Sequence, residues 1–378
     1  MKKKVLIGLL SLIAILLLVG GVFLHRQWKK PLGTPLGLIT PTPSQISATF
    51  TSEPTATQRV SSENPLETET PLPTVSPSAT QVQPVCGGPP LMYILGIGAD
   101  NEVNNYLYGL ADVIRIARVD FITPKITVLT IPRDLWVEFP AIKEKYADTV
   151  THGKINQAYL YGGPGMGYYE GEGGGPGLLA LTLAHNYGLY VDHYGAVNMI
   201  AFQKIIDALG GIDIYLDHDW DGRPVDDKTA DMGYFAAGQW HMSGNQALRF
   251  ARIRKKYSEV TRTDNQTLVM CAIKDKALSP SVVTKIPQLV QSLVGEVQTD
   301  LTLEQIMQLV CVMSKLEKEN LQFIRFPDDM MVQGRIYDPL LRDTTFVWDI
   351  PKEEIQAFIQ EFQNDTIPAG SSGGMGCP

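Results

Sequence analysis

The sequence predicts one layered α/β domain around a mixed sheet, preceded by an apolar membrane segment and a long unfolded segment. Between residues 87 and 366, short apolar and β-branched runs alternate with stretches of helical periodicity. Two of these runs are joined only by Thr123-Pro124, most simply as an antiparallel hairpin, which makes the sheet mixed rather than purely parallel. The first 86 residues show neither pattern.

Residues 1–30 are expected to form a membrane anchor. The run from Val5 to Leu24 carries no charge, and about 20 residues of helix span the ~30 Å of a bilayer core. Lys2, Lys3 and Lys4 precede this run and favour an amino terminus that stays inside. A cleaved signal peptide is the alternative, but no clear cleavage site of the A-x-A type follows. We therefore expect a single-pass protein of the cell membrane whose C-terminal domain is extracytoplasmic.

Residues 31–86 are expected to be a disordered stalk. The stretch from Pro31 to Pro84 contains ten prolines and eighteen serines and threonines, with Phe50 as its one aromatic residue. Such a segment cannot bury enough apolar surface to offset the entropy of ordering. It would lift the domain off the membrane. The glycine-rich tail, 367–378, is expected to be disordered as well.

Within the domain, residues 87–366, four strands are expected at Leu91–Gly98, Val113–Phe121, Lys125–Ile131 and Ile212–Leu216. Helices are expected at Leu178–Leu189, Asn198–Leu209, Arg262–Leu278, Leu303–Leu316 and Pro351–Phe362. A capping box at Ser243–Gln246 predicts a further short helix through Phe250. The glycine-rich stretch 162–176 lacks a lysine and does not stand between a strand and a helix, so we expect a mobile loop and not a phosphate cradle.

Composition excludes several classes of function. The net charge is −8, so the chain lacks the overall positive charge of a nucleic-acid-binding protein. The four cysteines form no CxxC pair, which argues against structural zinc. An extracytoplasmic domain permits disulfides. Cys271–Cys311 and Cys86–Cys377 are possible pairs, and free thiols on buried helix faces are the alternative for Cys271 and Cys311.

Acidic residues stand at the ends of the expected strands. Asp100 follows the first strand, Asp112 precedes the second, and Arg133-Asp134 follows the third. Polar groups at strand ends gather at one rim of an α/β sheet, where ligands bind in such folds. Two carboxylates at one rim repel each other unless a cation lies between them, and an all-oxygen site with phosphate co-ligands suits Mg²⁺. The ordinary role of a single such aspartate is to form a turn or cap.

A second cluster is basic. Arg252 and Arg254 alternate and would point the same way in extended chain, while Arg262 and Gln266 are one helical turn apart. Guanidinium groups bind phosphate oxygens in pairs, which lysine does less well. An isolated arginine pair would more simply be a solvated surface, and that is the expectation for Lys255, Lys256 and Glu259.

The order of these segments resembles the LytR-CpsA-Psr family across essentially the whole folded region. The matching stretches are Leu95–Asp100, Ala111-Asp112, Ile131–Asp134, Lys154–Asn156, Ala158-Tyr159, Tyr161–Gly163, Asp207–Asp213, Ser243–Leu248, Ala251–Arg254, Arg262-Thr263 and Gln266. The resemblance implies a three-layer α/β/α fold with a hydrophobic pocket for a polyprenyl tail. It also implies Mg²⁺-dependent transfer of a glycan phosphate from a polyprenyl-pyrophosphate carrier to a cell-wall acceptor hydroxyl.

The resemblance also implies residue roles. Asp100 and Asp112 would hold Mg²⁺ against the pyrophosphate. The groups that would bind the pyrophosphate are Arg133, Arg252, Arg254, Arg262 and Gln266, and the catalytic set would be Asp100, Asp112, Arg133, Arg252 and Arg254. One of the aspartates would also take the acceptor proton. Catalysis of this kind rests on positioning and charge.

Two positions depart from the family pattern. Leu110 and Asn265 stand where the family usually has arginines, and Arg115 would point away from the face of Asp112. A non-catalytic regulator that binds lipid pyrophosphate is therefore the alternative to an active transferase. A pyrophosphatase that uses water as the acceptor is a third possibility.

Overall fold

The computed structural model describes residues 26–37, 82–103, 105–367 and 377. The expected membrane segment, 5–24, lies outside these residues, as do 38–81 of the expected stalk and most of the tail. Among the described residues, no helix is both long enough and apolar enough to cross a bilayer.

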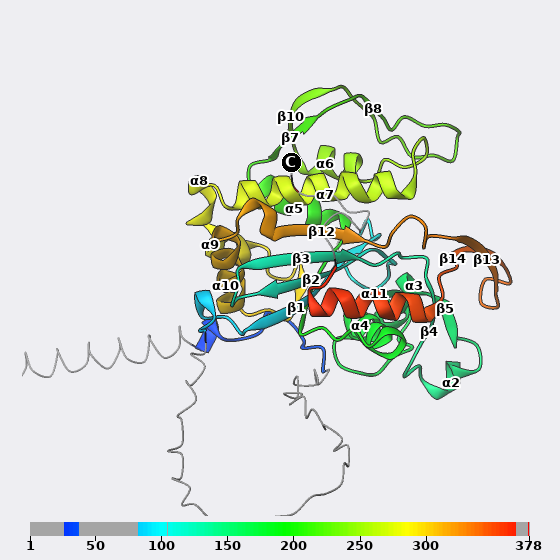
Figure 1. The fold of residues 1–378 in the computed structure, drawn as a ribbon. Coiled ribbons are helices and arrows are strands. Elements are labelled where there is room, and N and C mark those ends of the chain that lie inside the picture. The colour runs from blue at the N-terminus through cyan, green and yellow to red at the C-terminus, as the bar shows by residue number, and fades with distance from the viewer. Residues whose placement is uncertain (1–25, 38–81, 104, 368–376, 378) are drawn as a thin grey trace, which may run out of the picture. The chain divides into compact units, whose positions relative to one another are not determined.

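A six-stranded mixed sheet forms the centre of the domain (Figure 1). Its strands, in spatial order, are β11 (Gln298–Thr299), β6 (His193–Val197), β1 (Leu91–Ala99), β2 (Ala111–Asp120), β3 (Lys125–Thr130) and β12 (Leu321–Arg325). The β2–β3 pair is antiparallel, which confirms the expected hairpin, whereas β1–β6 and β3–β12 are parallel. The mixed sheet is therefore confirmed.

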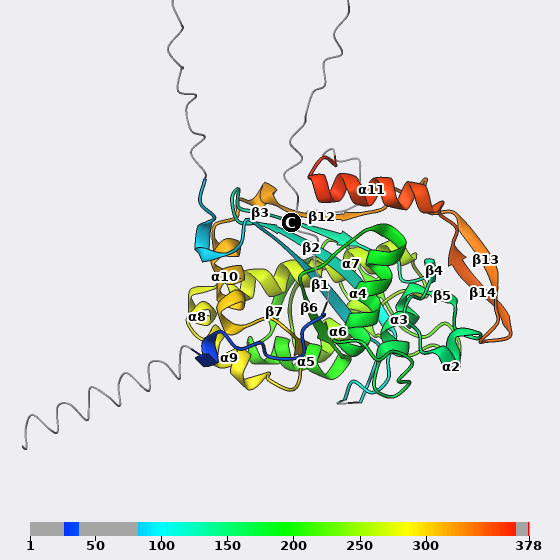
Figure 2. The same ribbon diagram turned by 90° about the horizontal axis from the view of Figure 1, so that it is seen from below.

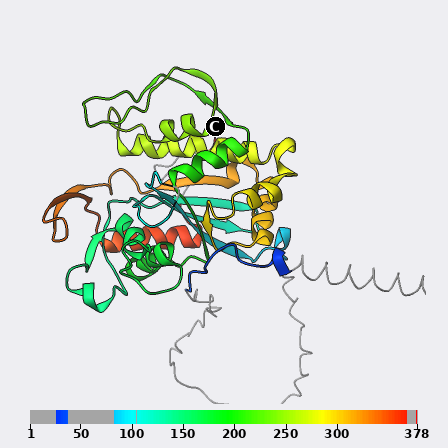
Figure 3. The ribbon, with the colours of Figure 1, turned by 180° about the vertical axis from the view of Figure 1, so that it is seen from behind.

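Helices cover both faces of this sheet, so the three-layer α/β/α arrangement is confirmed. On one side lie α5 (Met199–Ala208), α6 (Gly244–Ala251) and α7 (Glu259–Ala277) (Figures 1 and 3). On the other lie α3 (Ile155–Gly162), α4 (Gly174–Tyr187) and α11 (Lys352–Asn364) (Figures 1 and 2). At one end of the sheet are α8 (Pro280–Val283), α9 (Ile286–Ser292) and α10 (Leu303–Ser314).

The remaining elements are short. Four strand pairs flank the main sheet: β4 (Trp136–Glu138) with β5 (His152–Lys154), β7 (Ile212–Leu216) with β10 (Gly238–Met242), β8 (Trp220–Asp221) with β9 (Tyr234–Phe235), and β13 (Gln333–Asp338) with β14 (Asp343–Trp348). The other helices are α2 (Glu144–Ala147) and the 3-10 helices η1 (Val85–Gly87) and η2 (Lys318–Asn320).

Two of the expected helices, α5 and α6, begin at residues whose side chains cap them. Ser243 and Gln246 form the expected capping box of α6, and Asn198 accepts a hydrogen bond from the main chain of Ala201 at the start of α5. These caps satisfy main-chain N–H groups that have no partner inside the helix. Local sequence is enough to place such ends.

The expectation for the glycine-rich stretch 162–176 is wrong at both of its ends. Gly162 ends α3, and the first turn of α4 starts at Gly174. A Cβ on Gly162 would lie 2.6 Å from the carbonyl oxygen of Gly174, and one on Gly175 would lie 2.6 Å from that of Tyr159. The glycines therefore allow α3 and α4 to pack closely.

Part of the expected stalk is packed against the domain. Leu36 is 4% exposed within the main core, the main-chain N–H of Leu32 donates to the carbonyl of Leu301, and the Tyr194 hydroxyl donates to the carbonyl of Thr34. Residues 31–37 are thus ordered, contrary to expectation, because an apolar side chain there finds a site in the core. The composition of a segment does not predict that one of its side chains packs into the core.

Both possible disulfide pairs considered from the sequence are wrong, and no described cysteine is free. The bonds are Cys86–Cys311 and Cys271–Cys377. Cys86 lies in η1, which packs beside α10, and Gln308 of α10 donates to the carbonyl of Gly87 at 2.8 Å. Pairing follows this proximity of distant segments, which cysteine spacing does not reveal.

Candidate functional site

A cavity of about 610 Å³ lies between the sheet and the helices α5, α6 and α7. Its floor consists of β1, β2 and β6, where Gly96, Gly98 and Gly195 line it. A Cβ on Gly195 would meet no atom within 4 Å, so the absence of a side chain there leaves open space. This volume is typical of a pocket for a small molecule or an extended chain.

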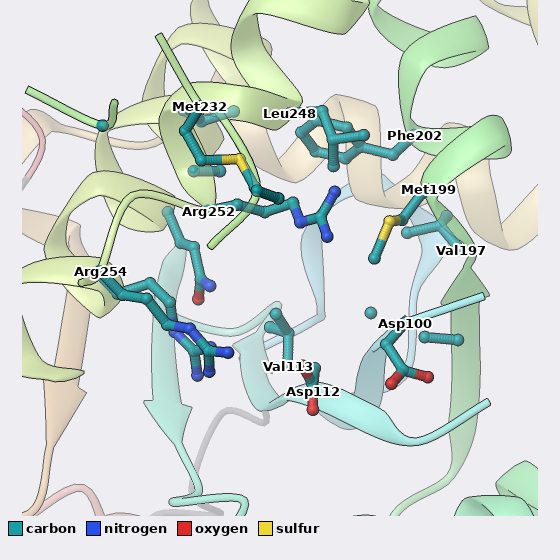
Figure 4. Close-up of a pocket in the computed structure, with 18 of the residues that line it drawn as sticks. Asp100, Asp112, Val113, Val197, Met199, Phe202, Met232, Leu248, Arg252 and Arg254 are labelled. Carbon is teal, nitrogen blue, oxygen red and sulfur yellow. The ribbon is translucent and has the colours of Figure 1, made fainter. Parts of the chain in front are cut away.

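The walls of the cavity are largely apolar. Figure 4 shows Val197, Met199, Phe202, Met232 and Leu248 along one side of it. These side chains come from β6, α5, α6 and the loop between β8 and β9. Val269 and Met270 of α7 line it too. Such a lining binds hydrocarbon and excludes water.

Two carboxylates lie at the polar end of the cavity, as the sequence predicted (Figure 4). Asp100 follows β1, and Asp112 is the second residue of β2, just beyond a register shift between the two strands. Oδ1 of Asp100 accepts a hydrogen bond of 2.6 Å from the main chain of Leu110. Burial raises the pKa of Asp100, and the nearby charge of Asp112 raises it further.

Arg133 bridges the acidic residues. Its Nη1 lies 2.6 Å from Oδ2 of Asp112, and its Nε lies 3.2 Å from Asp134 and 3.8 Å from Glu259. Burial lowers the pKa of Arg133, but the three acids outweigh burial, and the net pKa is raised. Arg133 therefore stays cationic beside Asp112.

The other predicted basic residues face the same space. Arg252 and Arg254 lie across the cavity from the two aspartates (Figure 4). Arg262 and Gln266, both on α7, line it as expected from their spacing. Burial lowers the pKa of Arg262, and the charge of Arg133 lowers it further. Glu259 is ion-paired with both Arg133 and Arg262 and partly neutralises the charge of the two guanidinium groups.

A second, smaller cavity of about 50 Å³ adjoins the first. Both cavities are lined by Asp112, Val113, Arg262 and Gln266, which form their common wall. Arg133 lines only the smaller cavity. Six of the seven site residues predicted from the sequence thus line the larger cavity, and Arg133 contacts one of them directly.

Two further charged residues belong to the site, although they were not among the residues predicted from the sequence. Glu259, expected on a solvated face, is ion-paired with Arg262 and lines the smaller cavity. Arg115 lines the larger cavity; it is 3% exposed and donates to Thr267 Oγ1 and to the Thr263 carbonyl, both at 3.1 Å. Arg115 lies across from Gly96 on β1, a strand register that the sequence does not give.

Arg115 anchors α7 to the sheet and does not reach toward the acids. Burial lowers its pKa to about 10, and only Asp264 opposes this effect. Lys255 and Lys256 are exposed, as expected, and both also line the larger cavity, where Lys256 Nζ lies 2.7 Å from Asp221. The positive charge around the cavity is therefore greater than the sequence suggested.

The two departures from the family pattern lie in different surroundings. Leu110 lies between the acids: its carbonyl accepts 3.0 Å hydrogen bonds from the main-chain N–H groups of both Asp100 and Asp112. Asn265 is 0% exposed and lines neither cavity. Only the departure at Leu110 therefore changes the surroundings of the two aspartates.

The donor set fits a hard divalent cation only in part. Within the described ranges, no group of three or more acidic, histidine or cysteine side chains is placed to hold a metal. Asp100 and Asp112 offer carboxylate oxygens at one rim. Burial, and to a lesser extent the charge of Asp112, raise the pKa of Asp100, and a cation between the two carboxylates would relieve their repulsion. Mg²⁺ usually keeps water or phosphate oxygens as further ligands. The pair is therefore suited to Mg²⁺ only when a phosphate ligand completes the site.

Comparison with known proteins gives consistent matches. Residues 54–362 match the LytR_cpsA_psr family. The polyisoprenyl-teichoic acid–peptidoglycan teichoic acid transferase TagU of Oceanobacillus iheyensis is 33% identical over 220 residues, which is 57% of this chain and 61% of that protein. The TagU protein of Bacillus mycoides is 26% identical over 307 residues, 81% of this chain and 82% of that protein.

Solved structures share the fold. The crystal structure of TagV from B. subtilis has a TM-score of 0.54 at 23% identity and covers 74% of this chain and 98% of that one. A structure of TagT bound to LIIa-WTA has a TM-score of 0.55 at 20% identity and covers 76% of this chain and 98% of that one. At these identities the likeness concerns the fold.

Proposed function

The chain belongs to the LytR-CpsA-Psr family, and from this membership we propose that it transfers a glycopolymer from a polyprenyl-pyrophosphate carrier to a hydroxyl of a cell-wall polymer. The proposal rests on a single cavity that combines an apolar part with a charged part. Its walls are largely apolar, and its polar end holds two carboxylates that face Arg252 and Arg254. A lipid pyrophosphate has the matching halves: a hydrocarbon tail and a charged head. The relatives are named as transferases that use polyisoprenyl-linked teichoic acid.

In the proposed reaction, the acceptor hydroxyl oxygen attacks the phosphorus that bears the glycan. The bond from that phosphorus to the bridging oxygen breaks, and the lipid monophosphate leaves. The hydroxyl proton passes to a carboxylate of the site, for which Asp100 and Asp112 are the candidates. The products are the glycan phosphate ester of the acceptor and the lipid monophosphate.

The side chains of the site act by binding and by charge. Arg252 and Arg254, across from the aspartates, bind the diphosphate oxygens, and Arg262 with Gln266 holds them from α7. Arg133 holds Asp112 in place through the 2.6 Å ion pair. Mg²⁺, held by Asp100 and Asp112 together with diphosphate oxygens, would supply further neutralisation of the diphosphate charge. Fixed positive groups stabilise charge on phosphoryl oxygens in the transition state.

We also propose that the domain acts outside the cytoplasm, at the membrane. Two disulfides fit an oxidising compartment. The uncharged run from Val5 to Leu24 would keep the protein in the same membrane as its lipid substrate. Protease accessibility of the domain in intact cells tests this localisation.

The direct test of the function is transfer of labelled glycan by the purified domain. A short-chain polyprenyl-pyrophosphate disaccharide serves as the donor and uncrosslinked peptidoglycan strands as the acceptor, with Mg²⁺ present. We expect labelled strands and released lipid monophosphate. Release of glycan phosphate without any acceptor would instead indicate a pyrophosphatase. No transfer and no donor binding by the wild-type domain would overturn the proposal.

Gly195→Leu tests the lipid part of the cavity. A leucine side chain here enters open space on the floor and occupies volume that the tail would fill. We expect donor affinity to fall about tenfold or more, because burial of roughly two methylene groups is lost. Gly195→Ala is the matched control, since one methyl group takes little of the cavity. Equal donor affinities for Gly195→Leu and wild type, measured by titration calorimetry, would place the tail elsewhere.

A second candidate function is a regulator that binds lipid pyrophosphate without turnover. Leu110, which lies between the two aspartates in place of the usual arginine, favours it. If the site is active but weakened, Leu110→Arg should raise the transfer rate about tenfold or more, since a phosphate-binding arginine can contribute several powers of ten. Donor binding without transfer, in both the wild type and Leu110→Arg, would support the regulator.

A further inference from the structure

We propose that the smaller cavity is the acceptor subsite, where a hydroxymethyl arm of a sugar in the acceptor polymer enters while the sugar ring rests against Trp348. This inference rests on the proposed function and adds the side from which the acceptor approaches. The smaller cavity adjoins the larger one at Asp112, Arg262 and Gln266, which line both.

The direction of approach follows from the chemistry of phosphoryl transfer. The attacking oxygen and the leaving oxygen lie roughly in line, on opposite sides of the phosphorus. The larger cavity has the apolar walls that hold the lipid, so the lipid phosphate leaves on that side. The residues of the common wall flank the phosphorus. The acceptor must therefore enter from the opposite side, and we assign that side to the smaller cavity, which adjoins the larger one at the common wall and lacks its lipid-binding residues Val197, Met199, Phe202, Met232 and Leu248.

The size of the smaller cavity matches one arm of a sugar and not a whole ring. A volume of about 50 Å³ holds a few atoms at most. A hydroxymethyl group fits within it, whereas a pyranose ring stays outside, at the entrance. A secondary hydroxyl on a ring would not reach the common wall without the ring entering as well.

The lining has the composition of a carbohydrate site. Trp348, Met331 and Phe326 provide apolar surface. Trp348 is half-buried and held at the end of β14: its main-chain N–H donates to the Asp134 carbonyl at 3.2 Å, and its ring meets Phe346 edge to face at 5.0 Å between centroids. A fixed aromatic face is a suitable platform for the apolar face of a sugar.

Charged groups that line the same cavity can bind hydroxyls. Glu259 and Arg133 come from the α7 side and the β3 side, and Arg325 comes from the end of β12. The Nε atoms of Arg262 and Arg325 are buried and have no hydrogen-bond partner among the described residues. Buried donors of this kind ordinarily have a partner, and acceptor oxygens would provide one.

The test separates the acceptor from the donor. Transfer by the purified domain is measured against the concentration of uncrosslinked peptidoglycan strands, and donor affinity is measured separately with the short-chain polyprenyl-pyrophosphate disaccharide. For Trp348→Ala we expect the acceptor KM to rise roughly tenfold, the order of an aromatic stacking contact, with donor affinity unchanged. Trp348→Phe should retain most of the acceptor affinity. Phe202→Ala, which lines only the larger cavity, should show the reverse pattern.

A second test variant and its control address the case in which Trp348→Ala fails to fold. Met331→Trp fills the smaller cavity without removing Trp348, and we expect loss of transfer with retained donor binding. Tyr337→Ala is the matched control, because this aromatic residue of the same hairpin is 59% exposed and lines neither cavity. An unchanged acceptor KM in both Trp348→Ala and Met331→Trp overturns the acceptor subsite. Failure of the wild type to bind the donor is a separate result, which would refute the proposed function and this inference with it.

Discussion

Asp112→Asn is expected to lower the rate of glycan transfer by about a thousandfold or more. Asp112 lines both cavities, is ion-paired with Arg133 at 2.6 Å and is one of the two carboxylates proposed to hold Mg²⁺. The amide keeps the size of the side chain but removes the charge that fixes Arg133 and would bind the cation. Loss of one preorganised charged group in an active site commonly costs two to three powers of ten, and here two functions are lost together.

The measurement is single-turnover transfer at saturating donor and Mg²⁺, with circular dichroism to verify folding. Glu102→Gln is the matched control: Glu102 lines the same cavity, its side chain is 71% exposed, and it lies 3.5 Å from Arg252. An exposed pair of this kind contributes little, so we expect a change of no more than a few fold. Similar rates for Asp112→Asn and wild type would remove Asp112 from the mechanism.

Loss of the Cys271–Cys377 disulfide is expected to destabilise the domain by about 4 to 5 kcal/mol. The bond joins residues 106 positions apart, and a cross-link over a loop of roughly 100 residues removes about 4.7 kcal/mol of unfolded-state entropy in the chain-entropy estimate. It also joins Cys377 to α7, the helix that carries Arg262 and Gln266. Urea unfolding of the Cys271→Ala/Cys377→Ala variant, compared with the oxidised wild type, measures the effect.

The Cys86→Ala/Cys311→Ala variant is the parallel experiment on the other bond. Peptide mapping of the non-reduced domain should recover Cys86 with Cys311 and Cys271 with Cys377. Recovery of a Cys271–Cys311 peptide would contradict the pairing. An unchanged urea midpoint after reduction of the wild type would show that neither bond stabilises the fold.

Much of the fold follows from local patterns in the chain. The β2–β3 hairpin, the start of α5 at Asn198 and the capping box of α6 all appear where expected. Each depends on residues within a few positions of one another, through side-chain alternation, helical periodicity or a cap. The glycine-rich stretch 162–176 was misjudged because the same glycines serve either a loop or the close packing of two helices. Which of these applies depends on α3 and α4 being in contact.

Some residues of the candidate site could likewise be predicted from the sequence, and others could not. Strand ends and arginine spacing identified the seven predicted residues, and the structure gathers them around two adjoining cavities. Glu259 was assigned to a solvated face because its neighbours in sequence are charged. In the folded chain it lies beside Arg262 and Arg133. Charge patterns along a chain do not report which distant charges meet.

The sequence alone determined the β2–β3 hairpin, and with it the mixed character of the sheet, the starts of α5 and α6, and the seven charged and polar residues that the structure gathers at the cavities. These features depend on short-range order along the chain. Tertiary structure alone decided the disulfide pairing, the ordering of residues 31–37, the glycine floor under the larger cavity and the common wall that separates it from the smaller one. Each of these is a contact between segments far apart in sequence. Such contacts form only when the whole chain packs, since their free energy comes from burial and charge in three dimensions and not from neighbouring residues.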